Sequence, residues 1–357
     1  MMMKYLLLTS AILFPLAACA AVGEKEIPVE QRIANAAPAV SVTARAETAP
    51  VGTDKADAAD DPAIWHNVAN PSASLIIGTD KKAGIYVYGL DGAARSFLPA
   101  GAINNIDLRD GIIVNGKPSI LVAASDRTDR AQAKLALFTL DPVSAALTHI
   151  ATLPAGAGEA YGFCMGRTGG ALHAVIVIKP GKILDMTLDV SGAQPAITAS
   201  RVMTNPTLSE GCVIDDRTGQ LYVSEEDVAI WRFDLSQAQP APVRFATVDG
   251  KMLVADSEGL ALAPAGTDGG YLIASSQGDN AYTLYHLPSG KPAGRFRIMP
   301  GKVDGTSDTD GIELAMGDFG PGYPGGLFVA QDGDNSPDAQ NFKLLAWDDI
   351  KAAVGIK

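Results

Sequence analysis

Two apolar segments joined by a polar turn form a unit that occurs six times along the chain. Each segment is a run of Val, Ile, Leu and Ala of strand length, so each unit predicts a β-hairpin. The hairpins begin at Leu75, Ile120, His173, Leu221, Tyr271 and Leu327. A further strand with an acid near its start precedes each hairpin, and the acids recur about every 50 residues, close to the period of propeller blades. These acids are Asp60, Asp107, Glu159, Glu210, Glu258 and Asp310.

This repeat predicts an all-β fold, a six-bladed β-propeller around a central channel. The 37 Gly and 22 Pro residues in 357 fit a chain with many turns. The alternating segment Val40–Ala46 precedes the first blade and has no partner of its own. We expect it to be the outer strand of the last blade, which closes the ring without an open edge.

The amino terminus has the pattern of an export signal. Lys4 precedes an apolar run from Tyr5 to Leu16, which is too short to span a bilayer. Leu16-Ala-Ala-Cys19 is similar to the lipobox of bacterial lipoproteins, in which the cysteine is acylated. We therefore predict a signal peptide over residues 1–18, a flexible tether over 19–39 and the propeller over 40–357. The protein is expected to be exported and lipid-anchored in the cell envelope; a soluble signal cut after Ala20, giving a secreted protein, is the alternative.

Two further cysteines and the net charge bear on the protein's surroundings. Cys164 and Cys212 lie in apolar, strand-like contexts, where buried free thiols are favoured over a disulfide. The net charge of −12 excludes nucleic acid as a partner, because phosphates require a basic face. We expect a monomer.

The fold predicts that polar residues from all blades meet at one end of the channel. Equivalent turns of a propeller lie at the same end, so residues about 50 positions apart become neighbours. The oxygen donors expected there are Asp60, Asp61, Glu210, Glu225, Glu226, Asp256, Glu258, Gln277, Asp304, Asp308 and Asp310, and the cations are Lys81, Lys82, Arg127 and Lys179. So many carboxylates would repel one another unless hard cations lay among them, which points to calcium. The Lys and Arg residues indicate an anionic ligand with phosphate groups. Taken singly, the Asp residues of such tips are ordinary turn formers.

Other hydrolase signatures do not occur. Neither Cys164 nor Cys212 is followed by an arginine at the spacing of a cysteine phosphatase loop, and the sequence contains no G-x-S-x-G or H-E-x-x-H motif. A calcium-activated water attacking a phosphate ester fits the remaining residues.

These residues and their order resemble the β-propeller (alkaline) phytases, which are calcium-dependent hydrolases of phytate, myo-inositol hexakisphosphate. The motifs that carry the resemblance extend from about Val40 to the carboxyl terminus. They include Asp60-Asp-Pro-Ala-Ile-Trp65, Asp80-Lys-Lys-Ala-Gly84, Ala124-Ser-Asp-Arg127, Ser209-Glu-Gly211, Glu225-Glu-Asp-Val-Ala-Ile-Trp231 and Asp304-Gly-Thr-Ser-Asp-Thr-Asp-Gly311.

The resemblance implies a role for individual positions. It implies that Lys81, Arg127, Tyr161 and Lys179 hold the phosphate that is cleaved, with Lys82 beside them. Several calcium ions with the attacking water are expected on Asp60, Glu210, Glu226, Asp256, Glu258, Gln277, Asp304 and Asp310. Asp61 and Glu47 are similar to ligands of separate, stabilising calcium sites. Pro180 departs from the family, since many members have an acidic residue after the equivalent of Lys179.

Two other functions are compatible with the acids alone. A calcium-dependent lactonase or another hydrolase on a propeller would need the carboxylates but not Lys81, Arg127 and Lys179 together. A non-enzymatic binding scaffold of the cell envelope would bind calcium without turnover. Phosphate release from calcium phytate distinguishes the three.

Overall fold

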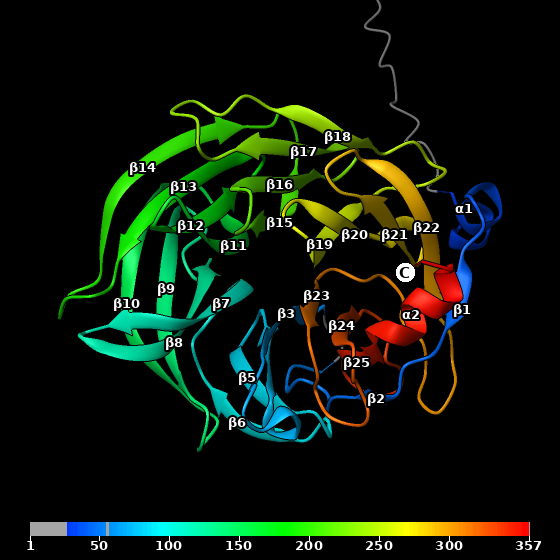
Figure 1. Cartoon of the computed structure of the whole chain (residues 1–357), viewed down its shortest axis with the longest axis horizontal. Helices are drawn as coiled ribbons and strands as arrows, with labels where there is room; N and C mark the ends of the chain where they lie inside the picture. Colours follow the sequence, from blue (N-terminus) through cyan, green and yellow to red (C-terminus); the bar gives the residue numbers. More distant parts are fainter. Residues whose placement is uncertain (1–26, 55–56, 357) are drawn as a thin grey trace, which may run out of the picture.

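A ring of six antiparallel sheets surrounds a central axis in the computed structural model, which describes residues 27–54 and 57–356 (Figure 1). The all-β, six-bladed propeller is thus confirmed. The predicted signal peptide and Cys19 lie outside the described residues. Among the residues described, no helix is long and apolar enough to cross a membrane.

Each blade consists of four strands in order from the channel outwards, and β1 adds a fifth to blade five. The inner strands are β3 (Ala59–Trp65), β7 (Ile103–Val114), β11 (Ala160–Thr168), β15 (Ser209–Asp215), β19 (Ser257–Ala265) and β23 (Ile312–Met316). The second strands are β4 (Leu75–Asp80), β8 (Lys117–Asp126), β12 (Ala171–Ile178), β16 (Gln220–Glu225), β20 (Gly269–Ser276) and β24 (Gly326–Asp332). The third strands are β5 (Gly84–Gly89), β9 (Gln132–Asp141), β13 (Lys182–Asp189), β17 (Ala229–Asp234), β21 (Ala281–His286) and β25 (Asn341–Ala346). The outer strands of blades one to five are β6 (Ala94–Leu98), β10 (Ala146–Ala157), β14 (Ala196–Thr204), β18 (Val243–Thr247) and β22 (Lys291–Ile298).

The core lies between the blades rather than within them. Clusters of buried side chains fill the space between each pair of neighbouring blades. On strand β4, Leu75 and Ile77 pack toward blade two, whereas Ile76 packs toward blade six. Because successive side chains point to opposite faces and both faces are buried, the second strands are continuous apolar runs rather than alternating ones.

The ring is closed by the amino-terminal segment, but not by the single strand that we expected over Val40–Ala46. Strand β1 (Val40–Val42) pairs in parallel with β22 of blade five. Strand β2 (Ala46–Glu47) pairs antiparallel with β25 and completes blade six. One straight strand cannot pair with the outer edges of two blades, so the chain bends between the two pairings. Closure by an amino-terminal strand is confirmed, with a shorter strand than predicted.

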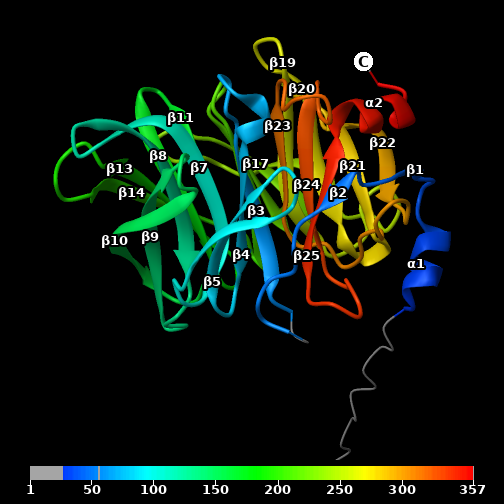
Figure 2. The ribbon, with the colours of Figure 1, turned by 90° about the horizontal axis from the view of Figure 1, so that it is seen from below.

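Part of the predicted tether has structure and contacts the propeller. Helix α1 (Val29–Asn35) lies at the outer side of blade five, near β1 and β22 (Figure 2). It contacts the short helix η2 (Gln277–Asp279). The ammonium of Lys251 donates to the carbonyl of Asn35 (2.6 Å), and the Arg295 guanidinium donates to that of Ala37 (2.6 Å). The described part of residues 19–39 is therefore attached to the propeller. Helix α2 (Trp347–Val354) is the last described helix, and a one-turn helix, η1 (Pro71–Ala73), precedes β4.

Cys164 and Cys212 form a disulfide, so the free thiols that we favoured are a wrong prediction. The two residues come from the neighbouring inner strands β11 and β15, and their Cα atoms are 5.7 Å apart. The apolar context of each cysteine reflects burial between blades three and four. Burial alone does not distinguish a thiol from a disulfide, and the pairing depends on a contact between positions 48 residues apart.

Candidate functional site: a two-ring polar mouth of the channel

An inner ring of side chains is formed at the start of the inner strands. Its members occupy equivalent positions: Asp60, Asn104, Tyr161, Glu210, Glu258 and Asp310. In blades one to five a β-bulge lies at this point, which redirects the side chain. In blades three to six the next residue is glycine. A Cβ on Gly162 would lie 1.9 Å from the carbonyl oxygen of Glu210, so only glycine permits this close approach of neighbouring inner strands.

Two of the acids that define the sequence repeat do not belong to this ring. The Asp107 carboxylate accepts from the backbone of Met165 (2.8 Å) and pairs with Arg109 (2.8 Å), further down the channel. Glu159 pairs with Arg127 in front of strand β11. The equivalent residues are Asn104 and Tyr161, because the loops that lead into blades two and three differ in length. Asn104 belongs to Asn104-Asn-Ile-Asp107, one of the motifs that carry the resemblance, but no role in the site was predicted for it from the sequence.

An outer ring is formed by the residue that follows each second strand. Its members in blades one to five are Lys81, Arg127, Lys179, Glu226 and Gln277. In each case the backbone N–H donates to the loop that enters the inner strand, at Ala58, Ala102, Glu159, Leu208 and Asp256 respectively. This shared hydrogen bond places all five side chains at the same end of the channel. Cations come from blades one to three, and oxygen donors from blades four and five.

Three carboxylates from blades four and five meet at the channel mouth. One oxygen atom of each of Glu210, Glu226 and Glu258 lies within 4.8 Å of the other two, and all three residues are buried. Burial, followed by the charge of Asp256, raises the pKa of Glu226 to about 7. For both Glu210 and Glu258, burial and then the charges of neighbouring acids also raise the pKa.

The acid cluster fits a calcium ion. Calcium binds oxygen at 2.3–2.6 Å, so carboxylate oxygens less than about 5 Å apart can share one ion. Within the described residues, Oε1 of Glu226 is buried and accepts no hydrogen bond. Buried oxygens rarely lack a partner, and carboxylates this close repel each other without a cation. The donor set therefore suits a hard divalent cation.

Lys81 connects the acids of blades one and six. Its ammonium lies 2.9 Å from both Asp60 and Asp310 and 2.6 Å from Asp57, and its side chain is 7% exposed. Burial alone would lower the pKa of Lys81, but these three charges outweigh it and raise the pKa. Burial raises the pKa of Asp310 to about 7 even beside this ammonium.

The remaining phosphate-binding candidates lie next to this cluster. The Lys179 ammonium is 3.7 Å from the centre of the Tyr161 ring. Burial, followed by the charges of Glu210 and Glu258, raises the pKa of Tyr161, so its hydroxyl remains a hydrogen-bond donor. Arg127 is buried, with Glu159 at 3.5 Å. Lys82 is exposed beside the mouth.

Asp256 and Gln277 line a cavity of about 510 Å³ at the edge of the mouth. Its opposite wall includes Arg32 and Asn35 of helix α1. The Gln277 amide donates to Asp310 (2.7 Å), which joins this side of the mouth to the acids around Lys81. The structure thus brings Asp256 and Gln277 to the same end of the channel as the inner ring.

Three predicted calcium ligands lie away from this mouth. Asp304 and Glu47 both contact the ammonium of Lys343, which is fully buried and also meets Asp332 (3.1 Å) and Asn335 (3.1 Å). This peripheral cluster joins strand β2 to blade six. Asp61 follows Asp60 but points to the other face of β3, where its carboxylate accepts from the backbone of Ile106 (2.9 Å). Burial raises the pKa of Asp61.

Comparison with known proteins agrees with this arrangement. A sequence model of the family described as Phytase matches residues 4–357. The chain belongs to the phytase family. Phytases are phosphoric monoester hydrolases, so the two rings are the candidate site for hydrolysis of a phosphate monoester. A 3-phytase of Bacillus subtilis (strain 168) is 38% identical over 332 residues, which are 88% of this chain and 85% of that phytase. A chain in the crystal structure of the mitotic checkpoint complex aligns over 87% of this chain and 96% of its own, with 11% identity and a TM-score of 0.49, a likeness too low to bear on function.

Proposed function

We propose that the protein hydrolyses the phosphate monoesters of phytate to lower inositol phosphates and inorganic phosphate, with calcium bound at the channel mouth. The observation that carries this proposal is the division of the mouth into two halves. Blades one to three present Lys81, Arg127 and Lys179, whereas Glu210, Glu226 and Glu258 face them from blades four and five. A lactonase has no use for three converging cations.

In this proposal the cations bind and orient the phosphate that is cleaved. Lys81, Arg127 and Lys179 contact its equatorial oxygens, where they spread the charge of the transition state. The Tyr161 hydroxyl donates a hydrogen bond to the same group. Lys82, exposed beside Lys81, meets a neighbouring phosphate of the substrate.

The acids supply the metal ligands and handle the proton of the attacking water. Ligands are proposed from Asp60, Glu210, Glu226, Asp256, Glu258, Gln277 and Asp310. When bound, calcium neutralises these carboxylates and lowers the pKa of a water molecule. The oxygen of Glu226 that accepts no hydrogen bond in the described structure would orient that water and accept its proton. No covalent intermediate is required.

We assign Asp304, Glu47 and Asp61 no part in the reaction. Asp304 and Glu47 belong to a peripheral cluster of oxygens in which Lys343 is the cation of the described structure. We propose stabilising roles for this cluster and for Asp61, within a propeller domain over residues 40–357.

We also propose that residues 1–18 direct export and that Cys19 carries a lipid which anchors the protein to the cell envelope. Residues 19–39 would then lead from the anchor to blade five. We propose a monomer that acts on phytate or calcium phytate. Metabolic labelling with a radioactive fatty acid, compared between the wild type and a Cys19→Ala variant, tests the anchor.

Removal of calcium is expected to abolish phosphate release. The test measures inorganic phosphate released from phytate at neutral to alkaline pH, with calcium, with excess EGTA, and with calcium restored. We expect release to fall at least about 100-fold in EGTA and to return with calcium. Calcium binding without release under any condition would favour a binding scaffold, and hydrolysis of lactones instead of phytate would favour the other hydrolase.

The metal-free protein is expected to lose stability as the pH rises from about 5 to about 8. Glu226 and Asp310 have pKa values of about 7 in the folded protein, above their ordinary values of 4.5 and 3.8. Between these values the folded state holds protons that the unfolded state has released, so the free energy of unfolding falls with rising pH. Calcium competes with these protons, and its stabilising effect should grow over the same range. Thermal unfolding in EGTA and in calcium across this range measures both trends; a stability that rises with pH in EGTA would contradict them.

A further inference from the structure

The disulfide lies directly beside the two residues at which the halves of the mouth meet. Cys164 is three residues after Tyr161 on strand β11, and Cys212 is two residues after Glu210 on strand β15. Tyr161 belongs to the phosphate-binding half and Glu210 to the acid cluster. The side chains of Tyr161 and Glu210 also interact across the boundary between blades three and four.

Cys212 marks the end of one β-bulge, and Cys164 lies one residue beyond the end of another. Strand β11 changes register between Ala160 and Phe163, and strand β15 changes register between Ser209 and Cys212. A bulge leaves its residues without regular ladder pairing, and the direction of their side chains depends on what holds the ends. Regular pairing resumes at Phe163 and Cys212. The disulfide therefore fixes the two bulges relative to each other at the point where the ladders begin again.

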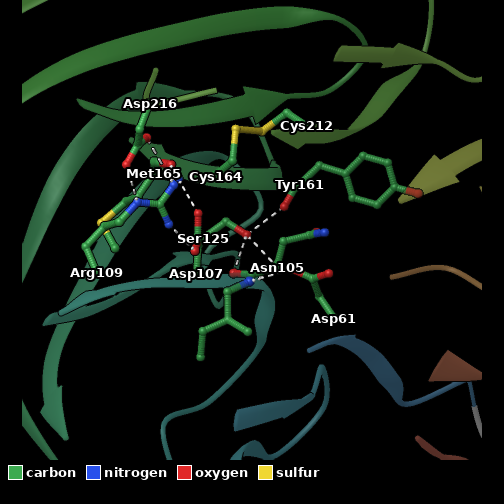
Figure 3. The surroundings of a disulfide bond; sticks show 11 residues. Asp61, Asn105, Asp107, Arg109, Ser125, Tyr161, Cys164, Met165, Cys212 and Asp216 are labelled. Carbon is green, nitrogen blue, oxygen red and sulfur yellow. Dashed lines mark hydrogen bonds and ion pairs between the residues drawn. A yellow bond between two sulfur atoms is a disulfide. The ribbon is translucent and has the colours of Figure 1, made fainter. Parts of the chain in front are cut away.

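The backbone of Tyr161 is held on its other side as well. The Ser125 hydroxyl donates to its carbonyl oxygen (2.6 Å; Figure 3). Gly162 packs against the carbonyl of Glu210 with no room for a side chain. Figure 3 also shows that the disulfide and the Ser125 contact hold the same short segment of β11 from two sides. Without the cross-link, β11 would be held against blade four by this packing and by hydrogen bonds such as that from the Arg167 N–H to Asp216 (3.0 Å).

We infer that the Cys164–Cys212 disulfide is a positioning element of the active site: it holds Glu210 where the acid cluster can bind calcium, and it holds Tyr161 beside that cluster. This inference rests on the calcium-dependent function proposed above. A disulfide that served stability alone would make the fold resistant to heat without changing the affinity for the metal. A positioning disulfide changes both.

The test is isothermal titration of calcium chloride into metal-free protein, without substrate. It compares the wild type with a Cys164→Ala, Cys212→Val double variant, which keeps most of the buried volume but lacks the cross-link. We expect the dissociation constant of the calcium ions bound at Glu258 to rise about 10-fold, the size of effect seen when groups that orient metal ligands are changed. These ions are identified by their loss in a Glu258→Gln variant. Wild-type protein purified throughout in reductant, with two free thiols counted, provides the same comparison if the double variant does not fold.

A Leu284→Ala variant is the matched control. Leu284 is fully buried in the core between blades five and six, and its truncation destabilises the fold without touching β11 or β15. Its calcium affinity should equal that of the wild type although its thermal midpoint falls. Equal affinity in all three proteins, or equal weakening in the cysteine and Leu284 variants, would overturn the positioning role. A wild type that binds no calcium would contradict the proposed function as well, whereas calcium binding without phytate hydrolysis would contradict only the reaction.

Discussion

Replacement of Lys81 by methionine is expected to lower the turnover of phytate by about 10²–10³-fold, the usual cost of losing a group that stabilises charge in a transition state. Lys81 is proposed to bind the transferred phosphate, and it also balances Asp60 and Asp310, each 2.9 Å from its ammonium. Methionine keeps the length and the apolar stem but leaves both carboxylates without this counter-charge. Initial rates of phosphate release at saturating calcium measure the effect.

The control for Lys81 is a Lys117→Met variant. Lys117 is exposed at the start of strand β8, and Arg127 follows the opposite end of that strand. The same change of charge there should leave turnover unaltered. Full activity of the Lys81→Met variant would remove Lys81 from the phosphate site even if the protein is a phytase.

Replacement of Glu258 by glutamine is expected to have opposite effects on metal binding and on stability. Removal of one of three clustered carboxylates should raise the calcium concentration for half-maximal activity by at least about 100-fold. The metal-free protein should gain on the order of 1–2 kcal/mol in free energy of unfolding. Burial and the charges of Glu210 and Glu226 raise the pKa of Glu258, so keeping it protonated in the folded state costs free energy, a cost that glutamine avoids. Calcium titrations of activity and urea unfolding in EGTA measure the two effects.

Glu313→Gln separates these effects. Glu313 is another channel acid, and burial followed by the charge of Asp107 raises its pKa to about 8, but it is outside the acid cluster at the mouth. Its replacement should also stabilise the metal-free protein while leaving the calcium requirement unchanged. An unchanged calcium requirement in Glu258→Gln would contradict the proposed metal site.

The repeat made the ring and the end of the channel predictable from sequence. A continuous apolar run such as Leu75–Asp80 fits only the second strand of a blade. The position of the residue that follows the run is then predicted as well. The residue that occupies the inner ring in each blade was harder to predict. Each bulge and each loop that enters an inner strand shifts that position by a few residues, as at Asn104 and Tyr161. Contacts between side chains that are distant in sequence left no local signal. The disulfide and the four oxygens around Lys343 are examples, and for that reason the sequence did not indicate that Asp304 contacts Lys343.

The place where the chain closes on itself is also a place where the active site is assembled. The N–H of Gly311 in blade six donates to the carbonyl of Asp60 in blade one (3.1 Å), and the two-residue pairing of β2 with β25 attaches the segment that precedes blade one to blade six. The ammonium of Lys81 spans this same seam, between Asp60 and Asp310. A ligand bound at this seam stabilises the closed ring, because its site exists only after blades one and six have come together. Closure of the ring therefore both stabilises the fold and completes the active site.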